Sequence, residues 1–397
     1  MRSLELFAGA GGLALGVSRA GFVPAAVIEW NRHCCATIRE NQQRRLEPVC
    51  HWPLIEGDVR DVDFKEIKGG IEFISGGPPC QPFSLGGKHH GQKDRRDMLP
   101  EAIRAVRALR PRAFVFENVK GLTRQKFANY FQYIQLQLAY PDLMPQTPED
   151  WQRHLERLER HHTQGTSTEL HYRVVARVLN AADHGVPQRR ERVFLVGFRS
   201  DLGIEWSFPE ATHSQAALLW SQGRGGEYWE RHEIARGQRP EDEKPHPRPS
   251  GSMDEAMLRP WRTVRDVTAD LPDPELHPEL AAEYFNHRFQ PGARSYTGHT
   301  GSPLDEPAKT LKAGDHGVPG GENMLLRPDG SVRYFSVRES ARLQTFPDDF
   351  VFHGSWTETM RQLGNAVPVD LAHAVASSVR RQLEAWKTGG DAGPCRI

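Results

Sequence analysis

Short apolar runs recur along the first half of the chain, mostly separated by segments long enough to form helices. The runs occupy residues 4–7, 25–28, 71–74, 113–116, 172–179 and 193–198. Short buried strands that alternate with helices are typical of βαβ units, in which successive strands lie parallel. The pattern therefore predicts a parallel sheet.

The middle of the chain is less regular. Residues 151–162 carry Leu155 and Leu158 at helical spacing, which predicts a surface helix. From about residue 207 the pattern breaks down, and residues 223–252 are rich in Gly, Arg, Pro and Glu, as expected of a loop or linker.

Regularity returns near the C-terminus. Residues 336–344 and 370–386 predict helices. The second helix has one apolar face, formed by Leu371, Val375, Val379 and Leu383.

Length and charge limit the number of domains and the kinds of binding partner that the chain can have. A chain of 397 residues can hold two domains, or one large catalytic domain with an insertion. Lys plus Arg and Asp plus Glu both number 51, so overall charge does not indicate a nonspecific polyanion-binding protein. Residues 81–126, however, contain eleven Lys or Arg against four acidic residues. This segment is either a solvated helix face or a local nucleic-acid surface.

The five cysteines predict neither a disulfide framework nor a metal site. Their number is odd, and no CxxC pair or paired His/Cys spacing typical of zinc is present. The adjacent His33, Cys34 and Cys35 are interpreted as structural helix residues. With no basic and apolar leader and no apolar stretch near 18 residues, we expect a soluble, cytoplasmic protein with no membrane partner.

A glycine-rich loop follows the first apolar run. Residues 8–14 satisfy a G-x-G-x-x-A pattern at a strand-to-helix turn, and Glu29 follows Gly9 by twenty residues. Glycine permits close backbone approach to a ligand, and an acid at the second strand end can accept hydrogen bonds from ribose. A dinucleotide oxidoreductase and a purely structural loop both remain open on this pattern alone.

Three further residues favour S-adenosylmethionine as the ligand of this loop. Phe7 and Trp30 offer aromatic surfaces, and Trp30 is suitably placed to stack on adenine. Asp58, after Gly57, supplies an acceptor for the adenine amino group. Each of the three also fits ordinary packing or a turn.

One cysteine lies at a predicted strand end. Residues 76–84 read Gly-Gly-Pro-Pro-Cys-Gln-Pro-Phe-Ser, and the prolines around Cys80 hold its thiol on a stiff loop. Ligands of open α/β sheets bind at that edge. A free cysteine is more often a packed apolar residue, and Cys80 taken alone favours that interpretation.

Several sequence blocks together resemble the C5-cytosine DNA methyltransferase family. They are FAGAGG from Phe7, Glu29-Trp30, Gly57-Asp58, GGPPCQPFS from Gly76, Glu117-Asn118-Val119, QRRER from Gln188, RESARLQTFPDDF from Arg338 and QLGNAVP from Gln362. The resemblance implies an α/β fold: a Rossmann-like S-adenosylmethionine-dependent methyltransferase sheet with helices on both faces, plus a smaller irregular target-recognition domain. We expect a catalytic and cofactor-binding part at 1–206, target recognition at 207–333, and a return to the catalytic domain at 334–397.

The resemblance implies a covalent mechanism. Carbon 5 of cytosine is a poor nucleophile, so the Cys80 thiolate would first add to carbon 6. Glu117 would donate to ring nitrogen 3 and Arg192 to oxygen 2, where negative charge develops. Gln188 and Arg190 would hold the site, although structural salt bridges remain an alternative for Arg190. The cytosine would have to rotate out of the duplex.

Candidate binding residues come partly from the resemblance and partly from the residue types alone, and no residue of the recognition segment is carried over from the resemblance. The expected S-adenosylmethionine contacts are Phe7, Gly9, Gly11, Gly12, Glu29, Trp30, Asp58, Pro79, Asn365 and Val367. Candidate DNA contacts are Ser84, Lys88, Arg95 and Arg96, on a loop expected to close over DNA. Candidate guanine contacts in the recognition segment are Arg224, Arg231, Arg236, Arg262, Arg288 and Arg294, with no basis for choosing among them.

The predicted substrate is double-stranded DNA, and the predicted enzyme is a monomer of the restriction-modification type whose cognate endonuclease acts on the same site. A transfer-RNA cytosine methyltransferase would share the catalytic blocks, but the long segment at 207–333 favours duplex reading. A catalytically silent base-flipping protein is the alternative outside catalysis. The intact set of Cys80, Glu117, Gln188, Arg190 and Arg192 argues against it.

Overall fold

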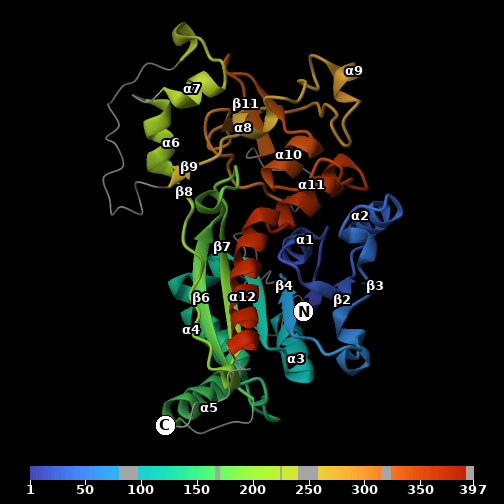
Figure 1. Ribbon diagram of the computed structural model, residues 1–397, viewed down its shortest axis with the longest axis vertical. Helices are drawn as coiled ribbons and strands as arrows, with labels where there is room; N and C mark the ends of the chain where they lie inside the picture. Colours follow the sequence, from blue (N-terminus) through green and yellow to red (C-terminus); the bar gives the residue numbers. More distant parts are fainter. Residues whose placement is uncertain (80–96, 166–169, 224–225, 240–257, 314–322, 390–397) are drawn as a thin grey trace. The chain divides into compact units, whose positions relative to one another are not determined.

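The computed structural model describes residues 1–79, 97–165, 170–223, 226–239, 258–313 and 323–389 (Figure 1). The chain divides into two compact units. Unit 1 comprises Met1–Leu179, Glu191–Pro209 and Ala372–Ile397, and unit 2 comprises Asn180–Arg190 and Glu210–Leu371. Unit 1 is thus assembled from both ends of the chain.

The unit boundaries differ from the predicted domain boundaries. Unit 2 begins near the expected residue 207 but extends to Leu371 instead of ending at 333, and it also takes Asn180–Arg190. Residues 334–371 pack with unit 2 because α10 and Phe335 contribute to its core. Packing into compact units does not show which parts bind cofactor and which read DNA, so the functional division stays a prediction.

Unit 1 contains a sheet of seven strands in the order β3-β2-β1-β4-β5-β7-β6. The strands are β1 (Arg2–Leu6), β2 (Val23–Glu29), β3 (Leu54–Glu56), β4 (Phe73–Gly76), β5 (Ala113–Val119), β6 (Tyr172–Asn180) and β7 (Glu191–Arg199). β1 to β5 pair in parallel, whereas β7 pairs antiparallel with β5. The expected parallel sheet is therefore confirmed for β1 to β5, and β7 reverses direction.

Helices cover both faces of this sheet. They are α1 (Gly12–Arg19), α2 (Arg32–Gln43), α3 (Leu99–Leu109), α4 (Ala128–Ala139), α5 (Trp151–Gln164) and α12 (Val369–Gly389). Apolar residues of α3, α4 and α5 form one core with Leu4, Ile74 and Phe116 of the strands. In Figure 1, α12 runs in front of the sheet and α4 behind it. Burial of both faces explains why the strands read as continuous apolar runs.

All six predicted apolar runs fall in or overlap strands, and the predicted helices over 151–162, 336–344 and 370–386 are present. β3 was not predicted, because it has only three residues and none of them is buried. The expected loop at 223–252 is wrong in part. It contains the short helix α7 (Glu227–Arg231), which forms because Tyr228 and Trp229 are buried.

Unit 2 is irregular, with short elements around small cores. Its elements are β8 (His213–Ser214), α6 (Gln215–Gln222), α7, β9 (Arg259–Pro260), α8 (Arg265–Thr268), α9 (Pro278–Ala281), β10 (Ser302–Pro303), β11 (Met324–Leu326), β12 (Val332–Tyr334), α10 (Val337–Leu343) and α11 (Trp356–Asn365). β8 pairs with β9, and β10, β11 and β12 form a second small sheet. A capping box between Ser336 and Glu339 starts α10, as its sequence favours.

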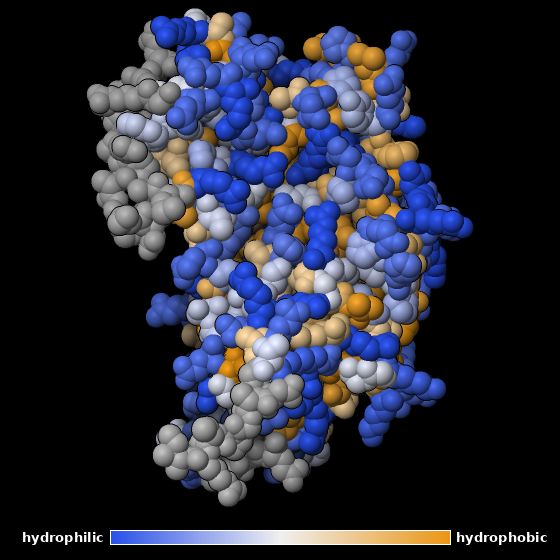
Figure 2. Space-filling model, in the orientation of Figure 1, coloured by the Kyte–Doolittle hydropathy of each residue, from blue (hydrophilic) through white to orange (hydrophobic). Residues whose placement is uncertain are grey.

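Figure 2 shows a face on which hydrophilic residues predominate and hydrophobic ones are scattered. Among the helices described by the structure, none has the length and apolar character to cross a bilayer.

Candidate active site

The carboxyl ends of the central strands of unit 1 meet at one edge of the sheet. Leu6 of β1 pairs with Gly76 of β4, and Gly76 pairs with Phe116 of β5. The loops that follow these strands therefore start side by side, at the edge where open α/β sheets bind ligands. The predicted glycine loop, the segment leading to Cys80, and Glu117 all begin here.

The glycine loop needs its glycines for conformation and for space. Gly9 and Gly11 have φ angles of 56° and 95°, in the left-handed region. A Cβ on Gly11 would lie 2.7 Å from the ring of Trp52, whereas nothing lies within 4 Å of a Cβ on Gly9. Open space beside Gly9 and the buried start of α1 at Gly12 fit a loop that a ligand approaches closely.

Glu29, at the end of β2, ties this loop to the start of α2. One carboxylate oxygen accepts a hydrogen bond from Gly9 N at 2.6 Å. The other accepts from Trp30 N at 3.0 Å and Asn31 N at 2.7 Å. Burial raises the pKa of Glu29, although these hydrogen bonds oppose the rise. Glu29 thus has a structural role in the loop, and its contact with ribose stays a prediction.

The other predicted cofactor residues of unit 1 differ in their exposure and in whether their side chains already have a partner. Trp30 is 70% exposed, as a stacking surface would need to be. Phe7 is half-buried with a φ of 53°, and Pro79 is exposed. The Asp58 carboxylate is already engaged by Arg60, which lowers the pKa of Asp58. An adenine amino group would have to share Asp58 with this guanidinium.

Glu117 and Arg192 form a buried ion pair at the carboxyl edge. The Nε atom of Arg192 lies 2.9 Å from Oε1 of Glu117, and their side chains are 14% and 9% exposed. Antiparallel pairing of β5 with β7 brings them together across the ladder. Burial lowers the pKa of Arg192, and the Glu117 charge opposes this. The two groups predicted to contact the pyrimidine ring are therefore adjacent.

The segment that leads to Cys80 passes beside this pair. A Cβ on Gly77 would lie 3.3 Å from Oε2 of Glu117, so the backbone there is close to the carboxylate. Asn118 Nδ2 donates to Pro78 O at 3.0 Å, and Met98 N donates to Pro79 O at 3.2 Å. The anchoring role of the Asn118 amide was not anticipated from the sequence.

Five predicted residues fall in 80–96, outside the described part of the chain. They are Cys80, Ser84, Lys88, Arg95 and Arg96. Of the basic residues beyond them, Arg104 pairs with Glu101 and donates to the carbonyls of Val59 and Val62, and Lys120 pairs with Glu191. These two members of the basic segment have structural partners.

Gln188 and Arg190 are wholly buried in unit 2, where they hold backbone. Gln188 donates to the carbonyl of Leu343 at 3.2 Å and accepts from Leu311 N at 2.9 Å. The guanidinium of Arg190 donates to the carbonyls of Leu311, Gly364 and Ala366 at 3.0, 2.7 and 2.9 Å. These contacts hold backbone segments of unit 2 together, and the role of Gln188 and Arg190 in catalysis stays a prediction.

The two predicted cofactor residues of unit 2, Asn365 and Val367, lie next to backbone carbonyls that Arg190 holds. Asn365 is exposed at the last position of α11, and Val367 is buried two residues later. Because Arg190 binds the carbonyls of Gly364 and Ala366, it fixes the backbone on both sides of Asn365. Their contact with S-adenosylmethionine stays a prediction.

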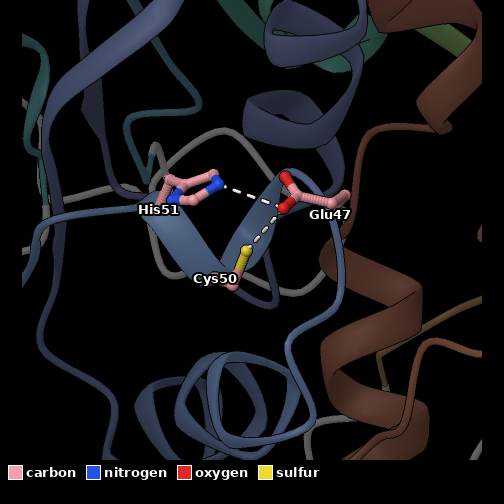
Figure 3. A group of neighbouring side chains, drawn as sticks. All are labelled: Glu47, Cys50 and His51. Atoms are coloured by element: carbon pink, nitrogen blue, oxygen red, sulfur yellow. Dashed lines mark hydrogen bonds and ion pairs between the residues drawn. The ribbon is translucent and has the colours of Figure 1, made fainter.

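Among the described residues, one group of side chains could offer ligands to a metal ion: Glu47, Cys50 and His51 (Figure 3). The Glu47 carboxylate bonds to the Cys50 thiol at 3.2 Å and to His51 Nε2 at 3.0 Å. The Glu47 and His51 side chains are 70% and 72% exposed, and burial together with the Glu47 contact raises the pKa of Cys50, which disfavours the thiolate that a metal prefers. The Glu-x-x-Cys-His spacing is the signal that sequence reasoning missed.

A family model described as C-5 cytosine-specific DNA methylase matches residues 1–140 and 156–381. The chain is 32% identical over 393 residues to the Type II methyltransferase M.PspPI of Psychrobacter sp. (strain TA137), covering 96% of this chain and 79% of that relative. It is 33% identical over 390 residues to the Type II methyltransferase M.Eco47II of Escherichia coli, with the same coverage of 96% and 79%.

A solved structure shares the fold. The S. pombe Dnmt2 methyltransferase matches with a TM-score of 0.54 at 16% identity, over 97% of this chain and 99% of that one. The chain therefore belongs to the C-5 cytosine-specific DNA methylase family, whose members use S-adenosylmethionine to methylate carbon 5 of cytosine in DNA.

Proposed function

We propose that this enzyme methylates one cytosine within a short duplex sequence, through a covalent bond between Cys80 and carbon 6 of an extruded base. The observation that carries the proposal is the buried Glu117–Arg192 pair beside Gly77. The mechanism requires both donors at the edge of the pyrimidine ring that carries oxygen 2 and nitrogen 3, while the thiol comes from the loop after β4. The anchored backbone of Pro78 and Pro79 leads into Cys80 from this position.

The chain's residues would act in sequence. The Cys80 thiolate forms a bond to carbon 6, and the electron pair displaced from the ring double bond is stabilised by Arg192 at oxygen 2 and Glu117 at nitrogen 3. Bound S-adenosylmethionine supplies the methyl group that carbon 5 receives. A base then removes the carbon 5 proton, and the electron pair of that bond expels Cys80 as thiolate.

The ion pair adds a requirement to this mechanism. A guanidinium partner stabilises the ionised form of a carboxyl group, whereas donation to nitrogen 3 requires a proton on Glu117. The incoming pyrimidine would relieve the conflict by presenting oxygen 2 to Arg192. Arg192 would then exchange part of its contact with Glu117 for the base, which leaves Glu117 able to carry the proton.

We also propose DNA contacts, a biological role and a location for the enzyme. Residues 207–333 would read the duplex sequence, and Ser84, Lys88, Arg95 and Arg96 would contact DNA near the nucleophile. The names of M.PspPI and M.Eco47II as Type II methyltransferases support a restriction-modification role with a cognate endonuclease. We place the enzyme in the cytoplasm as a monomer.

The test is base-resolution mapping of 5-methylcytosine after random-sequence duplex is incubated with the purified protein and S-adenosylmethionine. We expect methylation of a single cytosine within one recognition sequence. Cys80→Ala should abolish turnover while duplex binding persists, and Cys50→Ala is the matched control that should retain activity. Methylation of RNA in place of duplex DNA, or turnover by Cys80→Ala near the parent rate, would overturn the proposal.

A further inference from the structure

Unit 2 contains a pocket of about 280 Å³ lined mainly by cationic side chains. Its lining residues are His213 of β8, Arg231 of α7, Arg259 and Pro260 of β9, Arg262, and Asp266 of α8. Three arginines against one carboxylate leave the lining with an excess of two positive charges. Two of the elements that supply this lining, β8 and β9, pair with each other.

Two of the three arginines have no carboxylate partner among the described residues. The side chain of Arg259 is exposed, and that of Arg262 makes only a long contact of 3.5 Å with Gly185 O. This contrasts with other arginines of unit 2. Arg265 pairs with Asp305, and Arg342 pairs with Asp270 and Asp348. Arg259 and Arg262 are therefore available to an external anion.

The third arginine is held in place. Arg231 donates to Asp266 at 2.7 Å, and Asp266 also accepts from Thr263 N at 2.8 Å and contacts His232 at 2.9 Å. Asp266 is thus fully engaged on the protein side, which orients Arg231 and prevents the carboxylate from neutralising Arg259 and Arg262 as well.

One of the lining residues is His213, which is buried. Burial lowers the pKa of His213 to about 4, and the charges of Arg259, Arg262 and His184 add to the effect. The ring packs against Gly185, where a Cβ would lie 2.7 Å from it. His213 is therefore neutral at physiological pH, and the positive potential in the pocket comes from the arginines.

We infer that this pocket binds a phosphodiester group of the DNA backbone, with Arg259 and Arg262 as its principal contacts. The inference rests on the proposed function, which makes duplex DNA the substrate. A guanine edge offers two acceptors that one arginine satisfies in a plane. A phosphodiester offers several oxygen acceptors to guanidinium groups converging from different elements, and helix- and strand-held arginines suit it. Arg262 is thereby assigned to backbone positioning instead of the guanine contact considered for it, and Arg259 is added.

The test measures duplex affinity as a function of salt concentration with the full-length protein. Arg259→Gln/Arg262→Gln should weaken binding of cognate and noncognate duplex alike. It should also reduce the slope of log affinity against log salt by about 1.8, since each neutralised phosphate contributes about 0.9. Arg259→Lys/Arg262→Lys should restore most of the slope, because phosphate accepts a point charge and bidentate guanine reading does not.

A matched control removes two positive charges elsewhere. Lys65 and Lys68 are exposed in unit 1, so Lys65→Gln/Lys68→Gln should leave the slope unchanged. A glutamine variant with an unchanged slope, or one that loses only its preference for cognate duplex, would overturn the inference. Failure of the proposed function can be told apart from failure of this inference, because in the former case the unsubstituted protein would methylate no duplex. Competition by inorganic phosphate as effective as that by duplex, per phosphate, would indicate a free-anion site and also overturn it.

Discussion

Arg190 and Arg192 stand two residues apart, yet they serve different regions of the molecule in different ways. Arg192 pairs with the Glu117 carboxylate at the sheet edge of unit 1. Arg190 is wholly buried in unit 2 and donates to three backbone carbonyls. In the proposed mechanism the first contact is exchanged for the substrate base, which replaces the carboxylate as acceptor. The second contact holds backbone segments of unit 2 together.

The largest expected effect comes from breaking the Arg190 contacts. Arg190→Met keeps much of the volume but leaves buried carbonyls without donors, so we expect unfolding free energy to fall by about 3 to 5 kcal/mol. Denaturant unfolding of the full chain measures this. The control is Arg189→Met, because Arg189 is a partly exposed residue paired with Glu306 and its loss should cost less than about 1 kcal/mol. Equal costs for the two variants would contradict the comparison.

The next effect is kinetic and concerns Arg192. Arg192→Gln removes the proposed donor to oxygen 2, and we expect kcat to fall by about 10²- to 10³-fold. Steady-state methyl transfer measures kcat, and anisotropy measures duplex affinity, which should change by less than about threefold because the contact with oxygen 2 strengthens mainly as charge develops in the transition state.

The neighbouring pair Lys120–Glu191 supplies the control for Arg192. Both side chains are about half exposed, so Lys120→Gln should leave kcat near the parent value. If Arg192→Gln destabilised the protein as much as Arg190→Met while kcat stayed unchanged, both arginines would be structural.

A smaller, pH-dependent effect is expected at Glu5, a buried carboxyl on β1 that accepts a hydrogen bond from Ser75. Burial raises the pKa of Glu5 from 4.5 to about 7. The folded chain therefore holds a proton that the unfolded chain releases. Stability should fall as pH rises from about 4.5 to 7, by up to about 3 kcal/mol, and then level off.

Glu5→Gln removes this titration and should be more stable than the parent above pH 7, with little gain below pH 5. Unfolding free energies measured between pH 5 and 8.5 follow the difference. Glu66→Gln, at an exposed position of unit 1, should leave the pH dependence as it is. A parallel offset of the Glu5→Gln curve at every pH would show that Glu5 does not titrate in this range.

The sheet was predictable because strands buried on both faces read as uninterrupted apolar runs. β3 was not, because an edge strand with exposed residues lacks that pattern. α7 was missed for a similar reason. Its helical segment is short, and Tyr228 and Trp229 are buried in a cluster with Ala182 and Trp261, which are distant in sequence.

For the candidate site, the reactive residues could be predicted from the sequence better than the contacts that hold them. Cys80, Glu117 and the glycine loop could be singled out because catalysis and close ligand approach require particular residue types. Their partners could not. That Asn118 holds Pro78, that Glu29 holds Gly9, and that Arg259 has no carboxylate partner within the described part of the chain depend on contacts across strands and loops.

The amino-acid sequence alone determined the class of fold, the family and the candidate residues for the chemistry, because apolar periodicity, the blocks that resemble the family and reactive side-chain types can all be read along the chain. Tertiary structure decided what each charged side chain does. The same guanidinium group donates to buried carbonyls in Arg190, pairs with a carboxylate in Arg192 and lines a pocket in Arg259, because only packing determines how much water and which acceptors surround a charge.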